Sequence, residues 1–145
     1  MDKIRITKIF DFEMAHALKD YDGGCKNIHG HSYKLYITVI GEALNQEGHS
    51  KNGMLMDFAS LKQIVNKEII GFFDHTLILH KAQKIDTLSL QHKVIYVDYQ
   101  PTTENLLLEI KQKIKPLLPD NVSLYSLKLY ETATSYAEWF AEDNI

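Results

Sequence analysis

The sequence has little of several features that usually indicate a protein's class. A single cysteine among 145 residues excludes an internal disulfide framework, and a lone thiol suits a reducing compartment. No apolar run reaches the roughly 20 residues of a membrane-spanning helix, and residues 1–5 lack the apolar core of a signal peptide. The formal net charge is −3 without a basic block, which argues against nucleic acid as a partner. These absences predict one cytoplasmic domain spanning residues 1–145, bound to neither membrane nor nucleic acid.

What the sequence does contain is a dense group of potential metal ligands. The segment Cys25–His31 holds the only cysteine and two of the seven histidines. Where a chain enters a β-strand, residues two apart point to the same face, so His29 and His31 can bind one metal ion. A catalytic zinc usually takes three protein ligands, and His16, near the end of an earlier predicted strand, is the candidate third. The other interpretation is an ordinary surface pair of histidines.

The thiol of Cys25 also has two interpretations. A lone cysteine is most often a small buried hydrophobic residue. The flanking residues Gly23, Gly24, Lys26 and Asn27 are instead typical of a loop. A metal ion nearby would lower the pKa of the thiol and make the thiolate available as a base or nucleophile. We therefore expect a catalytic zinc with a reactive thiol beside it.

The apolar pattern along the chain predicts an α+β fold. Alternating residues indicate strands over 3–16, 33–43, 122–130 and 135–140, with shorter extended pieces at 54–56 and 94–97. Helical spacing indicates two amphipathic helices, one along Phe58, Leu61, Val65, Ile69 and Phe72, the other along Leu106, Ile110, Ile114 and Leu117. We expect a four-stranded antiparallel sheet with both helices on one face, and an irregular, mobile loop at 80–93. The uncovered face and the sheet edges favour oligomerisation.

Further chemistry-bearing residues stand at the ends of these predicted elements. Asp74 can fix the tautomer of His75, although spacing alone favours an ordinary helix C-terminus at which the histidine offsets the helix dipole. Glu131 follows a strand, where it is either a solvated acid or an acceptor of two hydrogen bonds from an amidine-like ligand edge. Thr102 is the expected N-cap of the second helix, and Glu104 in its first turn either compensates the dipole, as its position favours, or contacts a ligand.

Six segments occur in the order that resembles the 6-pyruvoyl-tetrahydropterin synthase family, whose bacterial branch includes the 6-carboxy-tetrahydropterin synthases of queuosine biosynthesis. The segments are Phe12–His16, Cys25–His31, Gly53–Phe58, Phe73–His75, Pro101–Asn105 and Tyr130–Thr132. The resemblance covers most of the chain. It implies a tunnelling fold, in which subunits join their sheets into a β-barrel, usually as a homohexamer built of two trimers with active sites between subunits.

The resemblance also implies a role for each candidate residue. Zinc is the implied cofactor, and its implied ligands are His16, His29 and His31. The implied catalytic residues are Cys25 as proton acceptor, His75 oriented by Asp74, and Glu131. The implied pterin pocket is formed by Glu131, Thr102, Thr103 and Glu104.

The implied substrate is the small molecule 7,8-dihydroneopterin triphosphate. Three residues separate Cys25 from His29, which is similar to the carboxy branch and implies 6-carboxy-5,6,7,8-tetrahydropterin, acetaldehyde and triphosphate as products. A related folate-pathway group typically has Glu in place of this cysteine, so Cys25 argues against membership of that group.

The chain departs from the family pattern after His75, and residues 80–100 run longer than in the shorter bacterial members. The alternatives are a 6-pyruvoyl product, a non-catalytic pterin- or purine-binding module on the same fold, and a structural zinc site with Cys25 as fourth ligand.

Overall fold

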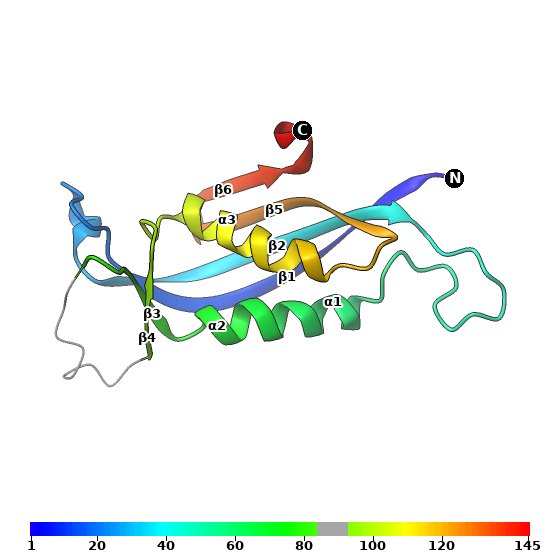
Figure 1. Cartoon of the computed structure of the whole chain (residues 1–145), viewed down its shortest axis with the longest axis horizontal. Coiled ribbons are helices and arrows are strands. Elements are labelled where there is room, and N and C mark those ends of the chain that lie inside the picture. The colour runs from blue at the N-terminus through cyan, green and yellow to red at the C-terminus, as the bar shows by residue number, and fades with distance from the viewer. Residues whose placement is uncertain (84–92) are drawn as a thin grey trace.

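The structure is a computed structural model that describes residues 1–83 and 93–145, apart from the side chain of Cys25. Within these residues, six strands form one sheet with the order β4-β3-β1-β2-β5-β6 (Figure 1). The strands are β1 (Lys3–His16), β2 (His29–Glu42), β3 (Thr76–His80), β4 (Lys93–Val97), β5 (Val122–Thr132) and β6 (Ser135–Phe140). The first helix consists of α1 (Phe58–Val65), the π-helical turn η2 (Asn66–Ile70) and α2 (Gly71–Phe73), which follow one another without a break. The second helix is α3 (Thr103–Ile114). Short 3₁₀ turns are η1 (Gly24–Lys26), η3 (Lys115–Leu117) and η4 (Ala141–Asn144).

The two longest strands, β1 and β2, pair antiparallel along their whole length and end at the pair His16↔His29. β2 begins at His29, earlier than the predicted residue 33, so both of its histidines lie within the strand. Alternate residues such as Phe12 and Leu35 are buried, whereas the residues between them are mostly exposed. One face of the sheet is therefore apolar and faces the helices.

Helix α1 begins where the sequence predicts, because the Asp57 carboxylate accepts a hydrogen bond from the Ala59 N–H. The predicted apolar stripe is wrong at its first residue, because Phe58 is half exposed. At its other end Phe72 is partly buried against the core, as predicted, but the neighbouring Phe73 is fully buried. The π-helical turn η2 explains the burial of Phe73, because it adds a residue to the turn and shifts the side chains that follow it around the helix axis.

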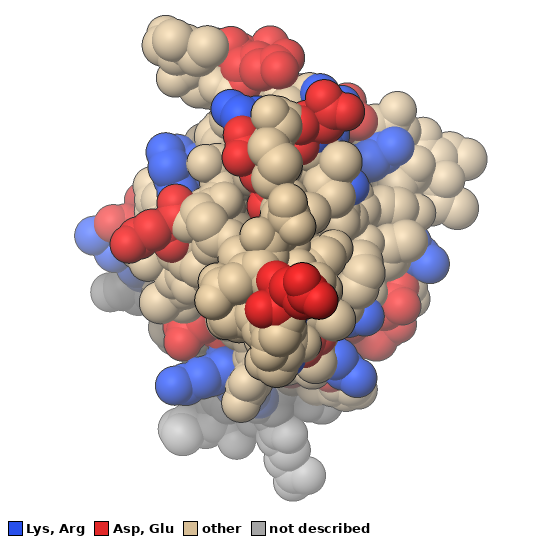
Figure 2. All heavy atoms as spheres, turned by 90° about the vertical axis from the view of Figure 1, so that its right-hand side faces the viewer, with Lys and Arg blue, Asp and Glu red and all other residues tan. Residues whose placement is uncertain are grey.

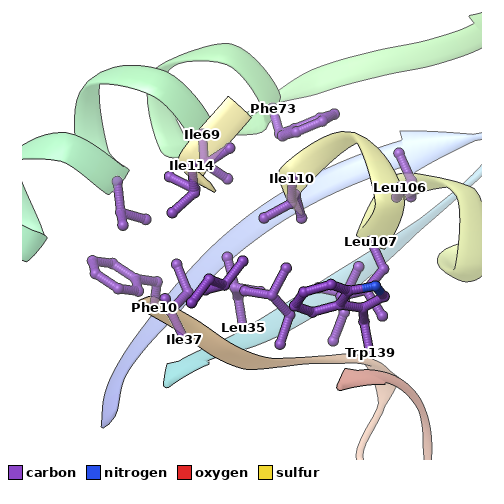
Figure 3. Close-up of a cluster of buried hydrophobic side chains, with 14 of the residues drawn as sticks. Phe10, Leu35, Ile37, Ile69, Phe73, Leu106, Leu107, Ile110, Ile114 and Trp139 are labelled. Carbon is purple, nitrogen blue, oxygen red and sulfur yellow. The ribbon is translucent and has the colours of Figure 1, made fainter. Parts of the chain in front are cut away.

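Helix α3 begins at the predicted N-cap, where the Thr102 hydroxyl accepts from the Asn105 N–H. Its buried apolar side chains are Leu106, Leu107, Ile110 and Ile114, which pack with Trp139 and residues of β1 and β2 between the helices and the sheet (Figure 3). Leu117 was expected in this stripe but lies in η3 and is 44% exposed, because Pro116 ends the α-helical hydrogen bonding.

The prediction of a four-stranded antiparallel sheet is wrong in its strand number and direction. β3 and β4 extend the sheet beyond β1, and both of these added pairings are parallel. β4 matches the predicted strand at 94–97, but β3 was not predicted. Four of its five residues are buried, so it has no alternating pattern that would distinguish it from other buried segments.

Two other predicted segments have different outcomes. Residues 54–56 form no strand, although Leu44 makes backbone hydrogen bonds with Gly53 and Met54 there. Most of the predicted mobile loop at 80–93 lies outside the described residues.

Acidic and basic side chains are interspersed at the end of the molecule that carries the N-terminus and the loop between β2 and α1 (Figure 2). Among the described residues, every helix is too short or too polar to cross a lipid bilayer.

Candidate metal and ligand site

Three histidines converge where β1 ends and β2 begins. His16 lies directly opposite His29 in the strand pairing, and His31 follows two residues later on the same face of β2. One ring nitrogen from each histidine lies within 4.8 Å of the other two. The predicted trio is therefore brought together, and it can hold a metal ion.

The hydrogen bonds of two of these rings fix where their protons lie. His16 Nδ1 is 2.7 Å from the carbonyl oxygen of Pro101, and His29 Nδ1 is 2.7 Å from that of Asn27. A carbonyl oxygen only accepts, so both Nδ1 atoms donate and each neutral ring keeps a lone pair on Nε2. Backbone carbonyls commonly orient metal-bound histidines in this way.

The two lone pairs face each other, because the Nε2 atoms of His16 and His29 are 3.0 Å apart. Facing lone pairs repel unless a cation or a proton lies between them. A tetrahedral zinc with bonds of about 2.0–2.1 Å would hold two nitrogens roughly 3.3 Å apart. The observed separation is close to that value, so the pair suits a shared metal ion.

His31 is the third member of the cluster, and one of its ring nitrogens is available to a metal ion. Its Nε2 atom is buried and has no hydrogen-bond partner among the described residues, and the Glu131 Oε1 atom lies 3.6 Å away. Burial is the main cause that lowers the pKa of His16 and of His31, which favours the neutral, metal-binding form of both rings. The three residues thus fit a metal ion on geometry and on donor chemistry.

Glu131 connects the histidine cluster to an adjacent cleft. Its Oε2 atom accepts a hydrogen bond of 2.5 Å from the Thr103 hydroxyl in the first turn of α3. A cleft of about 350 Å³ is lined by Thr103, Glu104, Glu131, Ser135, Tyr136 and Ala137. Three of the four residues predicted for the pterin pocket therefore lie together. Thr102 is the exception among the described residues, because its hydroxyl caps α3 instead of lining the cleft.

Asp74 and His75, which the resemblance implies as a pair, lie side by side directly before β3, and neither lines the cleft that contains Glu131. His75 Nδ1 is 3.1 Å from Asp74 Oδ2, and the other Asp74 oxygen accepts from the backbone N–H of Glu13. The His75 side chain is 80% exposed and its backbone has a φ of +58°. It lines a second cleft of about 520 Å³ with Glu13, Ser32 and His31, the last of which also belongs to the histidine cluster.

Cys25 lies in η1, the turn that connects β1 to the histidine-bearing start of β2. Its side chain is outside the described part of the structure, so its predicted place beside the metal remains a prediction. The adjoining Asn27 supplies the carbonyl that orients His29.

The carbonyl groups of Asn27 and Pro101 were missed by sequence reasoning. Every residue has a carbonyl, so the sequence holds no signal for such a role. Ser135 and Tyr136 in the smaller cleft were missed too, because a position on β6 becomes part of a site only through the pairing of β6 with β5.

Comparison with known proteins agrees with this architecture. The family model described as 6-pyruvoyl tetrahydropterin synthase matches residues 5–142, and the chain therefore belongs to this family. The 6-carboxy-5,6,7,8-tetrahydropterin synthase of Haemophilus influenzae is 37% identical over 141 residues, covering 93% of this chain and 97% of that protein. A Synechocystis protein of the same name is 32% identical over 137 residues, covering 94% of this chain and 92% of that protein. The dihydroneopterin monophosphate aldolase of Pyrococcus furiosus is 33% identical over 129 residues, covering 89% of this chain and 90% of that protein.

Solved structures show the same fold. The 6-pyruvoyl tetrahydropterin synthase of Caenorhabditis elegans matches with a TM-score of 0.70 and 22% identity, covering 97% of both chains. The enzyme of that name from Plasmodium vivax matches with a TM-score of 0.68 and 18% sequence identity, covering 96% of this chain and 98% of that one. The predicted tunnelling fold is confirmed, with the number and direction of its strands corrected as described above.

Proposed function

We propose that this protein is a pterin synthase that uses zinc to convert 7,8-dihydroneopterin triphosphate and water to 6-carboxy-5,6,7,8-tetrahydropterin, acetaldehyde and triphosphate. It would thus be a lyase of 7-deazapurine (queuosine) biosynthesis. The observation that carries the proposal is the convergence of three histidines on one point, beside a carboxylate that lines a cleft. Relatives named 6-carboxy-5,6,7,8-tetrahydropterin synthase, which are 37% and 32% identical over nearly the full length of the chain, support this reaction.

The proposed metal ligands are His16, His29 and His31. Zinc bound there would supply Lewis-acid polarisation of the hydroxyl groups on the substrate side chain. The protein's own contribution is to hold two of the rings through backbone carbonyls, so that each presents an unprotonated Nε2 atom.

Glu131 is the proposed anchor of the pterin ring. Its carboxylate has lone pairs beyond the one used by Thr103, and it can accept two hydrogen bonds from the amino-pyrimidine edge. The Thr103 hydroxyl fixes the orientation of the carboxylate, and Glu104 borders the same cleft. Thr102 contributes by capping the helix that carries Thr103.

Proton transfer is assigned to Cys25 as acceptor, with His75 oriented by Asp74. Within one chain, His75 and Glu131 line different clefts. We therefore propose that the relay is completed between subunits of a homohexamer, a dimer of trimers. The face of the sheet opposite the helices supports assembly, because it displays apolar side chains such as Ile9 and Tyr136.

Product analysis tests the reaction directly. Zinc-loaded protein is incubated with 7,8-dihydroneopterin triphosphate, and the pterin and any acetaldehyde are identified by mass spectrometry. A carboxy-pterin with acetaldehyde is expected, and Cys25→Ala should abolish it while pterin binding persists. A pyruvoyl product would keep the site but reassign the reaction. Zinc and pterin binding without turnover would leave a non-catalytic binding module.

A further inference from the structure

The segment that precedes α3 is attached to the end of β1 at two neighbouring points. The Gln100 side chain pairs with both backbone groups of Lys19: Nε2 donates to the carbonyl at 2.7 Å, and Oε1 accepts from the N–H at 2.9 Å. The next residue, Pro101, offers its carbonyl to His16 Nδ1 at 2.7 Å. Two consecutive residues therefore hold the two ends of the short segment from His16 to Lys19.

The backbone of Gln100 is itself fixed by α3. Its carbonyl accepts from the Thr102 N–H at 2.7 Å and from Asn105 Nδ2 at 3.0 Å. The first turn of the same helix also carries Thr103, which holds Glu131. One end of α3 thus positions a histidine of the cluster and the carboxylate beside it.

We propose that Gln100 is a positioning residue for the metal site, which rests on the metal-binding role proposed for His16. A single hydrogen bond between Pro101 and His16 leaves both partners free to rotate about it. The paired amide of Gln100 adds a second attachment and keeps the Pro101 carbonyl in line with Nδ1. His16 then retains its Nδ1–H form, and its Nε2 lone pair stays directed at His29.

The test compares Gln100→Leu, which removes both side-chain hydrogen bonds, with the matched control Gln112→Leu, an exposed position on α3. Zinc affinity is measured on metal-free protein by competition with a chelator, without substrate. We expect Gln100→Leu to weaken zinc binding about tenfold, within the range for groups that orient metal ligands, and the control to match the wild type. Unchanged affinity in Gln100→Leu would overturn the proposal while leaving the proposed function intact.

A second readout separates positioning from a general effect on stability. Long-range ¹H–¹⁵N NMR of the metal-free protein reports which nitrogen of His16 carries the proton. We expect the wild type and Gln112→Leu to show the Nδ1–H form, and Gln100→Leu to show a mixture. The same tautomer in all three would contradict the proposal.

A milder variant covers the case in which Gln100→Leu does not fold. Gln100→Glu keeps the size and the acceptor for the Lys19 N–H, but it places a carboxylate oxygen against the Lys19 carbonyl. We expect weaker zinc binding for this variant as well. Failure of both variants to fold would make Gln100 a residue of general stability and overturn its specific role. A wild type that binds no zinc would instead contradict the metal site itself, and this proposal with it.

Discussion

Glu131 is held in a way that leaves it available to a ligand. Thr103 donates to one of its oxygens, and the other oxygen lies 3.6 Å from His31. A carboxylate in this position can only accept hydrogen bonds, which matches a ligand edge made of N–H donors. Under the proposed function, the acceptor oxygens and the fixed orientation of this one side chain would select a ligand edge of N–H donors.

Replacing Glu131 by Gln should weaken pterin binding about 10- to 100-fold, because the amide presents a donor where an acceptor is needed and leaves a ligand N–H unpaired. The measurement is a calorimetric titration with neopterin, which lacks the triphosphate. Glu47→Gln, at an exposed position in the loop before α1, is the control and should bind like the wild type. Equal affinity in the two variants would contradict the anchoring role.

The sequence could identify which side chains form the site, but it could not predict which ring nitrogen of each histidine carries the proton. The spacing of His29 and His31, and the place of His16 at the end of the partner strand, were sufficient to predict the trio. The tautomers of His16 and His29 were beyond sequence reasoning, because main-chain carbonyls set them. One of these carbonyls, on Pro101, is 85 residues from His16.

At the scale of the element, helix starts depend on local chemistry. The Asp57 carboxylate caps α1, and its pKa is lowered, chiefly by the hydrogen bond from Lys51 and then by that from the Ala59 N–H. The folded pKa lies below the unfolded one, so the ionised group stabilises the fold at pH values above its ordinary pKa of 3.8. This contribution is lost as the pH falls through the folded pKa.

Asp57→Ala should therefore lower the melting temperature near neutral pH, and its difference from the wild type should shrink as the pH falls below the ordinary pKa of Asp. Asp57→Asn is the matched control, since Asn also caps helices but does not titrate. Its difference from Asp57→Ala should stay constant over the same range, as followed by thermal melts monitored by circular dichroism. A difference between wild type and Asp57→Ala that does not change with pH would show that the charge plays no part.

Local signals predicted the capped starts of α1 and α3 because the capping residue is itself in the sequence. They could not predict the π-helical turn, which leaves Phe73 fully and Phe72 only partly buried, since that shift becomes visible only in the packing of the helix on the sheet. β3 was missed for a related reason. Its buried residues show no alternation until its two neighbouring strands are known.

At the scale of the whole molecule, the residues that the structure describes cover the sheet on one face only. Both helices pack on the face that carries Phe12 and Leu35 (Figure 1). On the other face Ile9, in the middle of β1, is 49% exposed. Burying such a face against other subunits would remove apolar area from water, and this is the physical basis of the proposed barrel.

Ile9→Asp should reduce the oligomer mass in solution, because a charge would have to be buried in the proposed interface. Size-exclusion chromatography with light scattering measures the mass. Leu117→Asp, at a similarly exposed position outside the sheet, should keep the mass of the wild type. If Ile9→Asp also keeps it, this face is not the interface.

The central claim is an open metal site made of three imidazoles, and X-ray absorption spectroscopy of the zinc-loaded protein tests it most directly. We predict three imidazole nitrogens at about 2.0–2.1 Å together with a light-atom ligand, and loss of stoichiometric zinc in His31→Ala. A sulfur ligand at about 2.3 Å would show instead that Cys25 closes the site. That result would contradict the catalytic account and indicate a structural zinc.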